Sequence, residues 1–150
     1  MNPLIEKLKT PKDCDVFARN AREKNREDLA LEAEKRAIQL NAAQYGAETP
    51  AESECLQAIY AYERILTAKN NRNTRANRTW QMIKRHGILE AVERAVNRPS
   101  ETVGYTALVE MGLEDFAFEA VVVRHPTLFS AEAVDRCKLR IKSWEDEEQI

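Results

Sequence analysis

The chain has 150 residues, of which 43% are hydrophobic and 32% are charged, and its 23 basic and 25 acidic side chains leave a net charge of −2. This apolar content is too high for a disordered chain, and the length suits one domain with a substantial core. Nothing in the sequence resembles a secretory signal or a membrane span, and three widely spaced cysteines match neither a disulfide framework nor a zinc site. We therefore expect a cytoplasmic protein with free thiols and no membrane partner.

Helix-forming residues dominate, because the chain holds only 4 Gly and 5 Pro and is rich in Ala, Glu, Arg and Leu. Helix starts are indicated by Thr10-Pro11, Thr49-Pro50 and Ser130, which combine N-cap residues with acids in the first turn. We predict an all-α protein, a compact bundle of about seven or eight helices that begins with an antiparallel helical hairpin. The expected helices span residues 11–24, 28–44, 50–69, 75–86, 88–97, 102–111, 113–124 and 130–144.

The first two expected helices carry small side chains on one face, among them Ala30, Ala33 and Ala37, which allow two helices to approach closely. The sequence of these two helices resembles one tetratricopeptide-type hairpin of roughly 35 residues, but no second copy of the pattern follows in the chain. A solenoid needs about three stacked repeats, so we interpret it as a single hairpin. We expect one helical domain over 1–150, with subdomains 1–69 and 88–144 joined by a basic helix at 75–86 as the alternative.

Positive charge is concentrated in residues 64–89, which contain seven Lys or Arg and no Asp or Glu. The segments before and after it, 1–63 and 90–150, are both net acidic. Exposed ion pairs contribute less than about 1 kcal/mol each, so ordinary surface pairing gives little reason to exclude acids from this stretch. A local positive field attracts polyanions, and nucleic acid is the first candidate.

A helix over 75–86 places Trp80 and Ile83 on one apolar stripe, with polar and basic side chains on the opposite face. Arg pairs with guanine edges, Asn and Gln pair with adenine edges, and the helix start offers free N–H groups to phosphate. We therefore predict a non-enzymatic protein that binds DNA or RNA. Five cations between Arg72 and Arg85 would supply charge, Asn77 and Gln81 would contact bases, and the loop that begins at Lys69 would contact the backbone. The predicted nucleic-acid-binding residues are Lys69, Arg72, Arg75, Asn77, Arg78, Gln81, Lys84 and Arg85.

Three segments, Thr74–Gly87, Gly104–Gly112 and Asp115–Glu119, together resemble an uncharacterised bacterial all-α family that is loosely associated with restriction and phage-defence proteins. The resemblance implies a bacterial role linked to DNA. It supplies no activity and no functional residues.

Two other functions are compatible with the sequence. A helical adaptor would use the hairpin as a groove for a partner helix and the basic segment for an acidic protein surface. A metal-dependent nuclease would use Glu110, Glu114, Asp115 and Glu119, but the lysine that usually accompanies such carboxylates is missing. We find no catalytic signature and expect no cofactor and no metal; a homodimer would let two basic helices contact one duplex.

Overall fold

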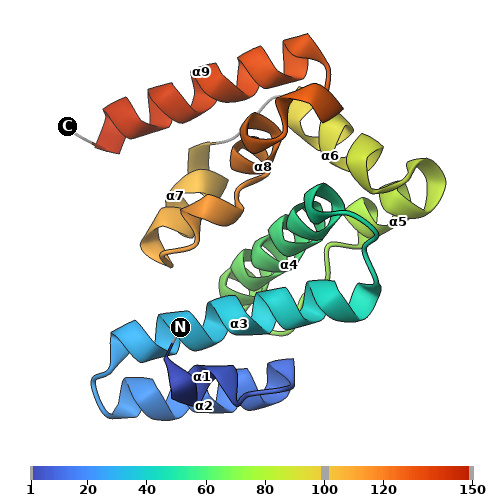
Figure 1. The fold of residues 1–150 in the computed structure, drawn as a ribbon. Coiled ribbons are helices and arrows are strands. Elements are labelled where there is room, and N and C mark those ends of the chain that lie inside the picture. The colour runs from blue at the N-terminus through green and yellow to red at the C-terminus, as the bar shows by residue number, and fades with distance from the viewer. Residues whose placement is uncertain (1, 99–101, 149–150) are drawn as a thin grey trace. The chain divides into compact units, whose positions relative to one another are not determined.

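The computed structural model describes residues 2–98 and 102–148, and within them every regular element is a helix (Figure 1). The predicted all-α class is therefore confirmed. The elements are α1 (Pro3–Glu6), α2 (Pro11–Glu23), α3 (Glu27–Tyr45), α4 (Pro50–Asn70), α5 (Asn77–His86), α6 (Ile88–Asn97), α7 (Thr102–Glu110), η1 (Glu114–Phe116), α8 (Phe118–Arg124), η2 (Pro126–Leu128) and α9 (Ala131–Glu148), where η denotes a 3₁₀ turn.

The chain divides into two compact units, Met1–Ala47 and Glu48–Ile150. The division falls after Ala47, whereas the alternative drawn from the sequence placed it after residue 69. α4 consequently belongs to the second unit, where it packs against α6, α7 and α8. The basic helix α5 lies inside that unit and packs against α6.

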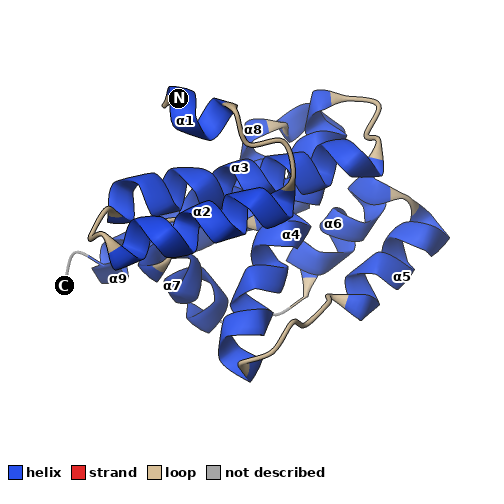
Figure 2. Cartoon of the chain, turned by 90° about the horizontal axis from the view of Figure 1, so that it is seen from below, coloured by secondary structure: helices blue, strands red, loops and turns tan. Residues whose placement is uncertain are grey.

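The first unit is built on the predicted hairpin of α2 and α3, which lie side by side in both views (Figures 1 and 2). Thr10 caps α2 by accepting the Asp13 N–H at 3.1 Å. Ala18 and Ala21 on α2 face Ala30 and Ala33 on α3, and all four side chains are buried. α1 was not predicted; it is a single turn whose Ile5 is fully buried in the same cluster.

The core of the second unit joins four helices that are far apart in the sequence. α4 contributes Cys55 and Ala58, and Phe129 joins them from the turn before α9. α6, α8 and α9 supply the other buried side chains of the cluster, which are Val92, Val96, Val121, Val122, Ala133, Val134 and Cys137. Ser130 caps α9 as predicted, since its Oγ accepts the Ala133 N–H at 3.1 Å. Glu93 on α6 accepts both the N–H and the hydroxyl of Ser130, at 2.8 and 2.7 Å, and so fastens the start of α9 to α6.

The expected helix 113–124 is interrupted. η1 ends at Phe116, Ala117 has an extended ψ of 144°, and α8 begins only at Phe118. This break turns the Leu113 and Ala117 side chains into the core, where both are buried. α9 also continues beyond residue 144, so the acidic tail is helical as far as Glu148.

Candidate nucleic-acid interface

The connection between α4 and α5 is held to the last turns of α4. Asn71 ends α4 in the left-handed conformation, with φ 54°, and the Arg72 N–H donates back to the Thr67 carbonyl at 3.2 Å. The Thr67 hydroxyl accepts the Thr74 N–H at 3.0 Å. The loop, drawn in tan between α4 and α5 in Figure 2, is therefore fixed at its middle before α5 begins.

A single carboxylate oxygen fixes the start of α5. Oε2 of Glu63 accepts the Arg75 Nε–H at 2.8 Å, the Ala76 N–H at 2.7 Å and the Trp80 indole N–H at 2.7 Å. The Glu63 side chain is 10% exposed, so these hydrogen bonds are largely shielded from water. A largely buried carboxylate that accepts hydrogen bonds from three donors strongly constrains the position of the segment that carries them, here the start of α5.

Aromatic contacts reinforce this anchor. The Trp80 ring lies 5.2 Å from the Tyr60 ring, and the Arg75 guanidinium lies 5.4 Å from the Trp80 ring centre. Tyr60, Glu63 and Thr67 are spaced by three and four residues, which places them on one face of α4. That face of α4 holds the loop and the first turns of α5.

The other predicted binding residues all lie on the surface, and we call them the α5 surface: Lys69, Arg72, Asn77, Arg78, Gln81, Lys84 and Arg85. Five of them follow helical spacing on one side of α5, opposite the buried Ile83. Lys69 lies in the last turn of α4, and Arg72 lies in the loop that precedes α5. Within residues 2–98 and 102–148, none of the five cations of the α5 surface forms an ion pair with a carboxylate.

Arg75 differs from this group, because its guanidinium already has an acidic partner in Glu63. The hydrogen bond with Glu63 raises the pKa of the Arg75 guanidinium above its ordinary value. The helix start differs as well, because Glu63 already accepts the Ala76 N–H where we expected phosphate. Glu63 was not among the predicted site residues, although it is the last acid before the acid-free segment and shares one face of α4 with Tyr60.

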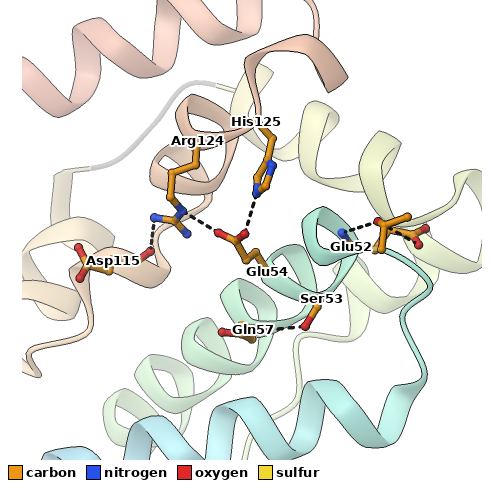
Figure 3. A network of polar contacts seen from close by, with 8 residues as sticks. Glu52, Ser53, Glu54, Gln57, Asp115, Arg124 and His125 are labelled. Carbon is orange, nitrogen blue, oxygen red and sulfur yellow. Dashed lines mark hydrogen bonds and ion pairs between the residues drawn. The ribbon is translucent and has the colours of Figure 1, made fainter. Parts of the chain in front are cut away.

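A second polar network links α8 to α4 (Figure 3). Glu54 on α4 pairs with Arg124 at 2.6 Å and with the His125 Nε2 at 2.7 Å, and Arg124 also donates to the Asp115 carbonyl at 2.9 Å. His125 is the C-cap residue of α8 and directly precedes Pro126. Its contact with Glu54 links the end of α8 to α4. His86, the other histidine, is exposed in the last turn of α5.

The acids proposed for a nuclease are dispersed. α7 ends at Glu110, and Glu114 lies in the separate turn η1, so these two residues do not share one helix face. Glu119 pairs with Arg140 at 3.5 Å. Among the residues that the structure describes, no three His, Cys, Asp or Glu side chains are grouped as metal ligands.

None of the helices in the described part of the chain combines the length and the apolar character that a membrane span requires.

Comparisons of the chain with protein-family models, with curated proteins and with solved structures find no match. The bacterial family resemblance that we see in Thr74–Gly87 therefore stays a prediction. The function proposed for the protein rests on its own residues and their geometry.

Proposed function

We propose that the protein binds nucleic acid, without catalysis, through the α5 surface. The observation that carries this proposal is the group of five exposed cations that have no carboxylate partner in the described parts of the chain. Three arginines of other helices, Arg22, Arg94 and Arg124, each form an ion pair. Exposed cations gathered along α5, the loop before it and the end of α4 give the positive potential that phosphates seek.

The side chains of the α5 surface suit different parts of a nucleic acid. Arg78, Lys84 and Arg85 supply charge for the backbone phosphates, and Lys69 and Arg72 extend that charge toward the end of α4. Asn77 and Gln81 lie among these cations and offer amide groups to base edges. A helix of ten residues is about 15 Å long, which matches the contact made by one helix in a major groove.

The hydrogen bonds to Glu63 also support the proposal, because they fix the orientation of α5. Because Trp80 and Ala76 are bound to a buried carboxylate on α4, the outward face of α5 keeps one orientation. Binding groups on a pre-organised element lose less conformational entropy when a ligand binds. The cations of α5 are thus presented from a fixed scaffold.

A charge-reversal experiment tests the proposal. Arg78→Glu with Arg85→Glu should abolish binding to a labelled DNA duplex, measured by fluorescence anisotropy at low salt, because both phosphate contacts become repulsive. The control is Lys138→Glu with Lys142→Glu, which changes net charge equally on the exposed face of α9 and should leave binding intact. Unchanged affinity in the Arg78/Arg85 variant would refute the proposal. Absence of DNA and RNA binding in the wild type would favour an acidic protein as the partner.

A further inference from the structure

The second unit contains a cavity of about 420 Å³, a size in the usual range for small-ligand sites. Its walls are rich in aromatic side chains from helices that are distant in sequence: Tyr62, Tyr105, Phe116, Phe118 and Trp144. Tyr105 and Trp144 form a stacked pair, with ring centres 4.5 Å apart and planes inclined by 22°. Flat aromatic walls of this kind suit a planar ligand.

The polar groups of the cavity define the rest of the ligand. Glu119 lines it with a side chain that is only 13% exposed, and Arg140 pairs with this carboxylate at 3.5 Å. Burial raises the pKa of Glu119, which hydrogen bonding and the charge of Arg140 only partly offset. Arg140 also donates to the carbonyls of Val96 and Arg98, at 2.6 and 2.7 Å, and is thereby held in place.

The charge balance disfavours a cationic ligand. The Glu119 carboxylate is already neutralised by Arg140, and the exposed Arg98 side chain adds a further positive charge to the lining. A ligand that is planar, donates a hydrogen bond to a carboxylate and carries an anionic group would match all three features. A nucleobase with an exocyclic amino group and an attached phosphate has this combination.

We infer that the cavity binds one nucleotide, with its base against the Tyr105–Trp144 pair, its amino group donating to Glu119 and its phosphate near Arg98. The nucleotide is either free or part of a strand. Thr79 of α5 also lines the cavity, but it lies on the side of the helix that carries Ile83, so a strand on the α5 surface reaches the cavity only by passing around α5. Binding of a nucleotide that belongs to a strand rests on the proposed function, whereas binding of a free nucleotide does not.

Tryptophan fluorescence provides the test. Trp144 is buried and stacked on the half-buried Tyr105, so a base bound against this pair should quench the Trp144 emission when cytidine monophosphate is added. Uridine monophosphate lacks the amino group and should bind about tenfold more weakly, the usual discrimination given by one well-made base contact. The chain has two tryptophans, so Trp144→Phe leaves only Trp80 and should remove the quenching.

A conservative variant separates the role of Glu119 from general damage to the fold. Glu119→Gln keeps the size of the side chain but can both donate and accept, so cytidine and uridine monophosphates should then bind with similar affinity. No quenching by cytidine monophosphate or by a single-stranded oligodeoxycytidine would overturn the inference. Quenching that persists in Trp144→Phe would do the same.

The source of the nucleotide is decided by the Arg78→Glu/Arg85→Glu variant. If a strand supplies the base, this variant should bind the oligodeoxycytidine at least tenfold more weakly while its response to cytidine monophosphate stays unchanged. Equal oligonucleotide affinity in variant and wild type would refute the proposed function but leave a cavity for free nucleotide. The two proposals therefore fail in different experiments.

Discussion

The buried carboxylate of Glu63 lies 2.7 Å from the indole nitrogen of Trp80, 17 residues further along the chain. The same oxygen accepts the Ala76 N–H, so one side chain of α4 determines where α5 begins and how it is turned. Apolar contacts alone would allow α5 to rotate or slide, since they are not directional. A charged hydrogen-bond acceptor with three donors selects one arrangement.

Loss of the Glu63 carboxylate should destabilise the second unit. Glu63→Ala removes the carboxylate that accepts the buried Ala76 N–H and the partly buried Trp80 indole N–H, and we expect the free energy of unfolding to fall by about 2 to 4 kcal/mol. Glu63→Gln retains an oxygen acceptor and should lose about 1 kcal/mol. Urea denaturation measures both variants. Glu132→Ala, on the exposed side of α9, is the control, and a Glu63→Ala variant as stable as this control would contradict the expectation.

Glu54 should make stability sensitive to acid. Burial raises the pKa of its carboxyl, but the hydrogen bonds from Arg124 and His125 outweigh burial and hold that pKa below its ordinary value of 4.5. A carboxyl whose pKa is lower in the folded state stabilises the fold fully above the unfolded value, and this contribution is lost as pH falls through the folded value.

We therefore expect Glu54→Gln to cost about 1 to 3 kcal/mol at neutral pH, with the difference from wild type shrinking below pH 4.5. Thermal or urea unfolding across this pH range measures the effect. Glu132→Gln is the matched control and should show no such change. A Glu54→Gln difference that is constant from neutral pH into acid would show that the carboxylate does not act through its charge.

The thiols should be unreactive in the folded protein. Cys14, Cys55 and Cys137 are fully buried. Burial, assisted by nearby carboxylates, raises the pKa of the Cys55 and Cys137 thiols to about 12, so very little thiolate is present near neutral pH. A chromogenic disulfide reagent should label none of the three thiols in buffer and all of them in denaturant. One rapidly labelled thiol in buffer would point to a local opening of the core.

Local signals made the helices predictable. Thr10 and Ser130 each accept a backbone N–H at the start of a helix, so their effect acts within one turn and can be read from neighbouring residues. The alanine spacing of the first hairpin likewise predicted its buried face. The interruption at Ala117 was not predictable in this way, because it depends on turning Leu113 and Ala117 into a core formed by distant helices.

The candidate sites were predictable only in part, for the same reason. Exposure of Arg78 and Arg85 follows from the apolar stripe on the other side of their own helix. The pairing of Arg75 with Glu63 depends on the course of the intervening loop, which helical periodicity does not specify. The cavity requires contact between Tyr105 and Trp144, which are 39 positions apart in the sequence, and no local pattern encodes that contact.

The contrast between paired and unpaired arginines gives the sharpest test of the interface. Arg78→Gln should remove one phosphate contact and reduce the slope of log K against log salt by about 0.9 for duplex DNA. Arg75→Gln should reduce that slope by much less, because Glu63 already binds the Arg75 guanidinium at 2.8 Å and would have to release it. Anisotropy titrations of both variants over a range of salt concentrations measure the slopes. Equal slopes for the two variants would mean that Arg75 leaves Glu63 when DNA binds, and the fixed start of α5 would then be a property of the free protein alone.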